Sequence, residues 1–149
     1  MKCKIVIDKT REEEVLIYTH ELTQTVKDIE NFVNSTSSEI IGYQDKAIFR
    51  ISPLKITCVY IEGNKIFALC NKEKYELKER LYVIEERLSG NFLKINQSCI
   101  VNVSEIERFD ASISGALNVV MKNGFKDYIS RRQLKQVKVR LGLKNEKIR

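Results

Sequence analysis

Two short polar segments in the second half of the chain carry side chains that suit the binding of nucleic-acid bases. The segment "NQS" (Asn96, Gln97 and Ser98) lies between two apolar runs, and "SRRQ" (residues 130–133) opens a basic stretch. Asn and Gln form paired hydrogen bonds with adenine, and Arg does so with guanine. From its spacing alone, "NQS" also fits an ordinary turn that links two strands, so both interpretations stay open at this point.

The second segment lies at the start of a predicted helix. Ser130 and Gln133 form an S-x-x-Q capping box, and Gly142 marks the expected end of the helix. The apolar side chains expected to face the protein body are Leu134, Val137 and Leu141. Because the first turn of a helix carries a partial positive charge, Arg131 and Arg132 cost a few tenths of a kcal/mol each there. Contact with phosphate, which releases counterions, is more favourable than that cost, so the two arginines indicate an anionic ligand.

The positive charge of the chain is concentrated at its C-terminal end. The formal net charge is +6, and residues 131–149 hold eight of the 26 Lys and Arg residues but only one acidic residue, Glu146. The rest of the chain is therefore close to neutral. A local excess of this kind indicates a polyanionic partner. A basic tail that is merely solvated has the same composition.

The sequence gives no signal for an enzyme or a metal site. His20 is the only histidine, and Cys3, Cys58, Cys70 and Cys99 form no CxxC pair. No glycine-rich phosphate loop and no HExxH or GxSxG motif occurs. We therefore expect reduced cysteines packed as small hydrophobic residues, no catalytic residues, no metal, no cofactor and no small-molecule substrate.

The lengths of the apolar runs and the N-terminal sequence bear on the cellular location of the protein. None approaches the roughly 18–20 residues of a membrane span. The opening "MKCKIVIDK" is a charged, alternating segment without the features of a secretion signal. A cytoplasmic protein is the expectation.

The first 50 or so residues predict a strand, a helix and two further strands. Residues 2–8 alternate apolar and polar side chains, which is typical of a half-buried strand. A helix is expected after the N-cap Thr19. Its apolar stripe has i, i+4, i+7, i+11 spacing and consists of Leu22, Val26, Ile29 and Val33. Two short strands follow, one on either side of residues 44–46.

From about residue 54 onward the pattern predicts mostly strands. Turn-forming pairs divide them at Gly63–Asn64, Asn71–Lys72 and Asn123–Gly124, the last suited to a two-residue type I′ turn. One short helix is expected where Leu81, Ile84 and Leu88 recur at helical spacing, with Gly90 as its C-cap. The sequence thus predicts an α+β fold, mostly β, with a small N-terminal strand–helix–strand unit and a C-terminal helix.

A series of residues in the second half follows the order of a known family pattern. It comprises an aromatic-led strand at Phe92, Gln97–Ser98, the run 100–102 ("IVN"), a strand led by Ile106, the Asn–Gly hairpin and the Ser-Arg-Arg helix start. Over roughly residues 50–143, this series resembles the LytTR family of bacterial DNA-binding domains. The resemblance implies stacked antiparallel β-sheets in which loops between strands, and not a recognition helix, contact duplex DNA.

The resemblance also implies which residues contact DNA. Gln97 and Arg132 match the base-contacting positions of the family, with Arg131 beside them for phosphate. The loop "EGNK" is shorter than the corresponding loop usually is, and Asn64 and Lys65 stand in for a third contact there. The expected backbone or supporting contacts are Asn64, Lys65, Asn96, Ser98, Ser130, Arg131, Lys135 and Lys138.

The same resemblance divides the chain and suggests its partners. Residues 1–49 would form an N-terminal α+β extension for dimerisation or regulation, residues 50–143 the LytTR-type DNA-binding domain, and residues 144–149 a basic tail. The implied function is that of a response regulator-like transcription regulator without a receiver domain, which binds major-groove bases of repeated half-sites as a homodimer. Similar stand-alone members are often associated with small membrane proteins that restrain them, so such a protein is a further expected partner.

Two alternatives from other classes remain at this stage. A protein–protein adaptor would use the basic tail to dock an acidic partner. An RNA-binding protein would display aromatic side chains for stacking on single-stranded bases, whereas most aromatic residues here alternate with apolar neighbours and are expected to be buried.

Overall fold

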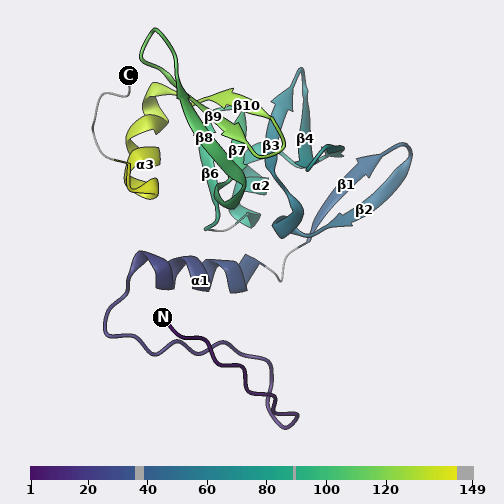
Figure 1. Ribbon diagram of the computed structural model, residues 1–149. Coiled ribbons are helices and arrows are strands. Elements are labelled where there is room, and N and C mark those ends of the chain that lie inside the picture. The colour runs from purple at the N-terminus through teal and green to yellow at the C-terminus, as the bar shows by residue number, and fades with distance from the viewer. Residues whose placement is uncertain (36–38, 89, 144–149) are drawn as a thin grey trace.

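A body of antiparallel strands makes up most of the protein. The computed structural model describes residues 1–35, 39–88 and 90–143, and these form ten strands, three α-helices and two short 3-10 helices (Figure 1). The fold is mostly β, as the sequence pattern predicted. Within the described ranges, no helix has the length and apolar composition that crossing a bilayer requires.

Seven strands form the larger sheet, in the order β2-β1-β5-β4-β3-β7-β6, and neighbouring strands are antiparallel. These strands are β1 (Ile40–Gln44), β2 (Ala47–Ile51), β3 (Cys58–Glu62), β4 (Lys65–Cys70), β5 (Glu73–Leu77), β6 (Phe92–Asn96) and β7 (Cys99–Asn102). The short 3-10 helix η1 (Pro53–Lys55) connects β2 to β3. The division proposed after residue 49 therefore falls inside β2, and the sheet itself begins at Ile40.

The smaller sheet has three strands in the order β10-β9-β8. They are β8 (Ile106–Ala111), β9 (Leu117–Met121) and β10 (Lys126–Tyr128), and η2 (Val103–Glu105) leads into them. The helix α3 (Arg131–Leu141) follows β10, and α2 (Leu81–Arg87) lies between β5 and β6 in the chain.

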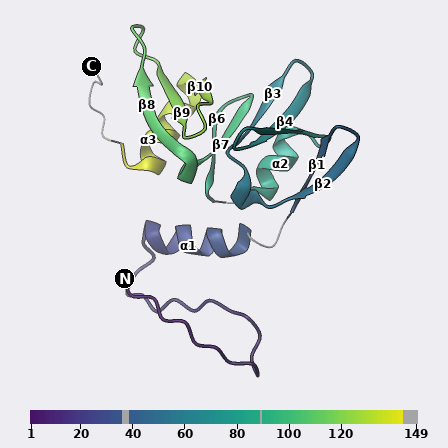
Figure 2. The ribbon, with the colours of Figure 1, turned by 45° about the vertical axis from the view of Figure 1, so that its right-hand side comes forward.

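The centre of the larger sheet is buried on both faces. The strands β3 and β7 send alternate side chains to opposite sides, as strand geometry requires. Val59 and Ile100 enter a core that includes buried residues of α2, whereas Cys58 and Cys99 enter a second core shared with the smaller sheet and α3. The ribbon shows α2 and α3 on either side of β6 and β7 (Figure 2). The first residues of both strands are therefore apolar, whereas β3 ends in the exposed Glu62 and β7 in the buried, polar Asn102.

Three of the four turns expected in the β region and before it are confirmed. Residues 45–46 join β1 to β2, with both φ angles positive. Glu62 pairs with Lys65 around residues 63–64, and Cys70 pairs with Glu73 around residues 71–72. The local turn residues thus set the register of three successive hairpins.

The Asn123–Gly124 hairpin is correct in position but wrong in type. Residues 122–124 form a three-residue loop closed by a hydrogen bond from Met121 N to Phe125 O (2.8 Å), and only Gly124 has a positive φ (+93°). The Asn123 side chain accepts from Phe125 N (3.0 Å) and donates to Asn71 O (2.6 Å). This contact between two hairpin tips accounts for the wider loop, which no local pattern could show.

The helix α2 forms where the apolar spacing predicted it, but its expected C-cap is wrong. Leu81, Ile84 and Leu88 are all buried. Leu88, with φ −81°, occupies the C-cap position in place of Gly90. Gly90 instead gives room to another helix, because a Cβ atom there would overlap the Asn31 side chain.

The N-terminal part departs most from expectation. The helix α1 (Gln24–Ser35) begins after Thr23, whose hydroxyl accepts from Val26 N (3.3 Å), and not after Thr19. Residues 2–8 form no strand, and Cys3, Ile5 and Ile7 are exposed. Alternation marks a segment that can pair and bury one face, but the part of the chain that the structure describes supplies neither a strand partner nor a covering layer for it.

Candidate nucleic-acid interface

Three chain segments that are far apart in sequence meet at one end of the β body. They are the β3–β4 turn (residues 62–65), the β6–β7 turn (residues 96–98) and the junction of β10 with α3 (residues 128–132), which together we call the loop surface. Ile61 N donates to Ser98 O (2.9 Å), and Ser130 N donates to Ile95 O (2.9 Å). Backbone hydrogen bonds therefore hold the three segments in a fixed arrangement.

Asn96 connects two of these segments through its side chain. Its Nδ2 donates to Tyr128 O (2.8 Å), and its Oδ1 accepts from Ser98 N (2.8 Å). The residue is 0% exposed. Asn96 therefore cannot touch DNA, and any supporting part that it plays is to fix the turn that carries Gln97.

Gln97 is the exposed residue at the tip of the β6–β7 turn. Asn96 and Cys99 pair on either side of it, so the turn contains only Gln97 and the half-buried Ser98. None of the described residues forms a hydrogen bond with the side-chain amide of Gln97. Both the donor and the acceptor of this amide face solvent.

The start of α3 presents two arginines to solvent. Ser130 caps the helix, since its hydroxyl accepts from Gln133 N (3.3 Å). The reciprocal half of the capping box is absent because Ser130 N is already bonded to the β6 backbone. Arg131 and Arg132 are exposed, and neither forms an ion pair with a carboxylate of the described residues.

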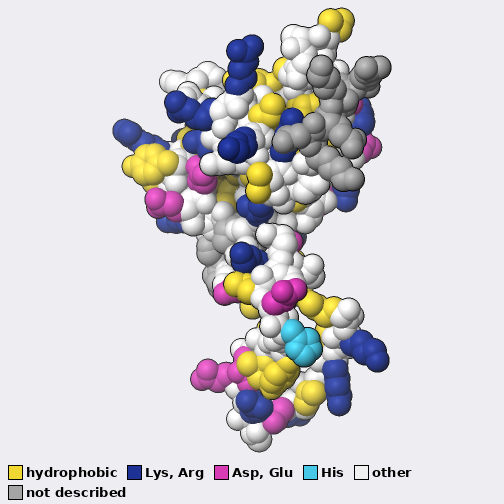
Figure 3. All heavy atoms as spheres, turned by 90° about the vertical axis from the view of Figure 1, so that its left-hand side faces the viewer, with side chains coloured by type: hydrophobic (Ala, Val, Ile, Leu, Met, Phe, Trp, Pro, Cys, Tyr) yellow, Lys and Arg dark blue, Asp and Glu magenta, His cyan; other side chains and the backbone are white. Residues whose placement is uncertain are grey.

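The body of α3 adds further cations. Val137 is fully buried, and Leu134 and Leu141 pack beside it, which confirms the predicted apolar stripe. Lys135 is exposed and Lys138 is half-buried. In the view onto the α3 side, Lys and Arg side chains are spread over the upper part of the molecule (Figure 3). The basic tail, residues 144–149, lies outside the described residues.

The β3–β4 turn supplies the third segment. Asn64 is exposed next to Gly63, whose φ of +63° favours glycine. Lys65 Nζ lies 3.8 Å from Glu76 Oε1, and Glu76 also pairs with Lys78 at 3.0 Å. An exposed ion pair of this kind contributes about 0–1 kcal/mol, so Lys65 can exchange Glu76 for another anion at little cost.

Sequence reasoning missed two residues at this end of the molecule. Tyr128 is 53% exposed, and its carbonyl accepts the Asn96 hydrogen bond two residues before the α3 cap Ser130. Ile113 is fully exposed in the β8–β9 loop. This loop lies near the start of α3, because Ile129 N, next to the cap residue Ser130, donates to Leu117 O at the end of the loop. The available signals were an aromatic residue at a strand end and a single Ile in a loop of small residues, and both patterns are also common in turns without function.

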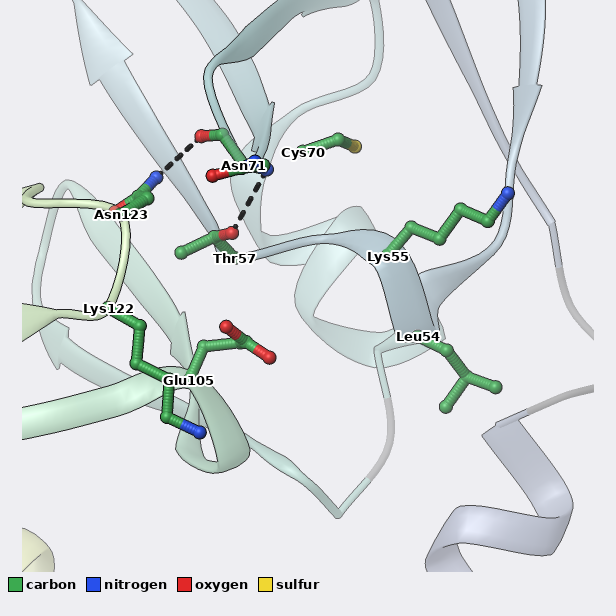
Figure 4. Close-up of a pocket in the computed structure, with 8 residues that line it drawn as sticks. All are labelled: Leu54, Lys55, Thr57, Cys70, Asn71, Glu105, Lys122 and Asn123. Atoms are coloured by element: carbon green, nitrogen blue, oxygen red, sulfur yellow. Dashed lines mark hydrogen bonds between the residues drawn. The ribbon is translucent and has the colours of Figure 1, made fainter.

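A hollow lies at the other end of the β body, away from the loop surface. It is lined by Leu54, Lys55, Thr57, Cys70, Asn71, Glu105, Lys122 and Asn123. Asn123 and Thr57 each hydrogen-bond to the backbone of Asn71, whereas Lys55 and Leu54 point away from that contact (Figure 4). The polar groups thus join two hairpins and do not converge on a common point.

The loop surface is basic and is built from turns at one end of stacked β-sheets, and a domain surface of this class suits a polyanionic ligand. The comparisons identify the class more closely. A model of the LytTr DNA-binding domain matches residues 46–142. The chain therefore belongs to the LytTR family of DNA-binding domains.

Relatives cover almost the whole chain. Uncharacterized HTH-type transcriptional regulators of Staphylococcus aureus are 31% identical (strain NCTC 8325) and 32% identical (strain MSSA476), over 96% of this chain and 99% of theirs. A solved structure, the LytTr DNA-binding domain of a Bacillus cereus protein, has a TM-score of 0.66 at 19% identity and covers 70% of this chain and 97% of its own. In the present chain, strands separate every two successive described helices, so these helices form no helix–turn–helix pair.

Proposed function

We propose that this chain is a bacterial transcription regulator that binds duplex DNA sequence-specifically through the loop surface and acts in the cytoplasm, where bacterial DNA lies. The observation that carries the proposal is the presence of two exposed, unpaired guanidinium groups beside an exposed glutamine amide, all on a backbone fixed by hydrogen bonds. Membership of a DNA-binding family and the similarity to staphylococcal transcriptional regulators support it.

Each cation and amide has a distinct part in this proposal. Gln97 and Arg132 contact base edges in the major groove, where their planar groups can form paired hydrogen bonds with adenine and guanine. Arg131, Lys135 and Lys138 contact phosphates, which positions the protein without specifying sequence. Asn64 and Lys65 contact the sugar–phosphate backbone of the DNA from the neighbouring β3–β4 turn.

The fixed backbone matters because the base contacts must be held in register. Exposed side chains on a mobile loop lose conformational entropy on binding. Here the turn of Gln97 and the cap of α3 are connected through the buried Asn96. The proposal therefore assigns Asn96 the role of a positioning residue.

A single domain with a few base contacts discriminates weakly against the many competing sites of a genome. We therefore propose that two protomers bind repeated half-sites together. Two copies of the loop surface would roughly double the free energy of discrimination, provided that the half-sites match the spacing of the pair.

The proposal is tested by fluorescence anisotropy with the duplex from the region upstream of its own gene, a random duplex of equal length and the corresponding single strand. We expect preference for the upstream duplex. A plot of log K against log salt should have a slope of about −3.6 per protomer, from the four cations assigned to phosphates, Lys65, Arg131, Lys135 and Lys138. Equal affinity for both duplexes would favour the adaptor alternative. Tighter binding of the single strand would favour the RNA alternative.

A further inference from the structure

The N-terminal arm, residues 1–23, exposes more large apolar side chains than a solvated segment of a single chain should. Ile5, Ile7 and Tyr18 are 85%, 87% and 93% exposed, and Val6 and Leu16 are also exposed. Several large apolar side chains exposed in one short segment indicate an interaction site. The arm and α1 lie below the β body, on the side away from the β3–β4 turn, in both ribbon views (Figures 1 and 2).

The backbone of the arm is mostly extended, and its backbone hydrogen bonds among the described residues are local, at residues 8–11 and near residue 23. A turn at residues 8–11, in which Asp8 accepts from Thr10 N (2.9 Å), separates a first stretch (residues 1–8) from a second (residues 12–19). No hydrogen bond between described residues joins the two stretches. An exposed edge of unpaired N–H and C=O groups is a template for pairing with another chain.

One face of the second stretch is already directed at α1. Val15 and Ile17 line a hollow together with Val26, Ile29 and Val33 of the helix. Because side chains alternate along an extended backbone, Leu16 and Tyr18 project to the opposite side. Glu12 and Glu14 project to that side as well, so it combines exposed apolar and acidic side chains. No layer of the described residues covers Leu16 or Tyr18, which are 60% and 93% exposed.

The charges of the arm indicate what covers it. The first eleven residues contain four basic side chains (Lys2, Lys4, Lys9 and Arg11) and one acidic side chain, Asp8. The next ten contain four acidic side chains (Glu12, Glu13, Glu14 and Glu21) and neither Lys nor Arg. Among the described residues of the arm, Arg11 and Glu14 form an ion pair within the chain (2.7 Å), whereas Lys2, Lys4, Glu12 and Glu13 form none. A surface with a basic half and an acidic half is complementary to its own copy rotated by a two-fold axis.

We infer that the arm and α1 form a dimerisation surface, in which the basic stretch of one chain lies along the acidic stretch of a second copy. The arm and α1 together comprise 35 residues, which is enough for the roughly 20–30 residues that each partner contributes to a stable interface. The match to the staphylococcal relatives covers 96% of this chain, so it extends into the arm. Pairing below the body leaves both loop surfaces free for DNA.

This inference deepens the proposed function, and it rests on that function only for the use of the pair on half-sites. Pairing itself is measured without DNA, by sedimentation equilibrium of the full chain at micromolar concentrations. We expect the mass of a dimer. Two variants isolate the charge pattern: an acidic-arm variant (Lys2→Glu with Lys4→Glu) and a basic-arm variant (Glu12→Lys with Glu13→Lys).

Each arm variant alone should dimerise at least about tenfold more weakly, because two like-charged contacts replace two attractive ones across the axis. An equimolar mixture should recover the dimer as a heterodimer, since the acidic arm of one variant then faces the basic arm of the other. The four side chains are exposed, so the thermal unfolding of the β body should not change. A control variant with Lys72→Glu and Glu86→Lys, both exposed on the body, should dimerise like the wild type.

Three outcomes would overturn the inference: a wild-type chain that stays monomeric, arm variants that dimerise like the wild type, or a mixture that fails to recover the dimer. The first outcome would also be the result if a different protein covers the arm. A monomer that still prefers its upstream duplex would leave the proposed function standing. A dimer that binds all duplexes equally would support the dimerisation surface and refute sequence-specific binding.

Discussion

Replacement of Asn96 tests how the loop surface is held together. Asn96→Ala removes two hydrogen bonds of 2.8 Å and leaves Tyr128 O and Ser98 N without their partners. Each lost bond costs about 0.5–1.5 kcal/mol, and each group left unsatisfied adds up to roughly 1–3 kcal/mol where water cannot reach it. Both backbone groups are only partly buried, so we expect a total loss of about 2–4 kcal/mol.

The assay is urea unfolding followed by circular dichroism, where a lower midpoint with an unchanged slope reports stability alone. The matched control is the neighbouring Gln97→Ala, which should change stability by less than about 0.5 kcal/mol because the side chain is exposed. In the DNA titration both variants should lose discrimination between duplexes. Wild-type stability in Asn96→Ala would refute the positioning role.

A second substitution at this position adds a pH signature. Asn96→Asp retains an acceptor for Ser98 N but places a carboxylate against Tyr128 O. Burial should raise the pKa of the new carboxyl above its unfolded value of about 4. The protonated group can donate to Tyr128 O, so the stability deficit relative to wild type should be small below about pH 4 and grow as the pH rises through the folded-state pKa. A deficit independent of pH would contradict this account.

Three further expectations concern other parts of the molecule. Arg132→Ala should lose about 1–3 kcal/mol of discrimination at one base position. Lys138→Ala should instead weaken the binding of all duplexes alike and reduce the salt slope by about 1. If both variants lost affinity equally for every sequence, Arg132 would have no base-contacting role. Ser130→Ala should destabilise the protein by about 1 kcal/mol in urea unfolding because the α3 cap is lost. Burial raises the pKa of the Cys58 thiol to about 12, so at pH 8 iodoacetamide should modify the exposed Cys3 long before Cys58, and equal rates would show that the second core opens readily.

The elements that the sequence predicted best are those specified by local signals. The helix α3 has a capping serine, an apolar stripe and a terminal glycine with φ +67°, and all three are in place. The hairpins at residues 45–46, 63–64 and 71–72 likewise follow from residues that tolerate positive φ or two-residue turns. Local geometry decides these features, so a single sequence reveals them.

The elements that were missed depend on contacts between distant segments. The loop at Asn123 is widened by its bond to Asn71, and Gly90 serves the packing of Asn31 and not the end of α2. Asn96 looked like a surface residue beside Gln97, yet it is buried because Tyr128 supplies a carbonyl partner 32 residues further along the chain. Tertiary structure selects among several locally acceptable roles in each case.

The candidate site shows the same division. Pattern alone singled out Arg131 and Arg132, because cations conflict with the dipole at a helix start. Gln97 was assigned through the resemblance to the LytTR family, since its turn also fits an ordinary link between strands. The exposure of Tyr128 could not be predicted, since alternation does not say which face of a short edge strand is covered. The missing strand at residues 2–8 is a related case, in which the pattern indicates pairing but not the partner.

The central claim is that duplex DNA binds at the loop surface. Its most direct test is an amide chemical-shift titration of the labelled full chain with the preferred duplex. The account predicts that the largest shifts fall on residues 62–65, 96–98 and 128–132, with the arm and the Asn71–Asn123 contact little changed. Shifts that instead concentrate on the arm, on α1 or around Asn71, with the start of α3 unaffected, would contradict it.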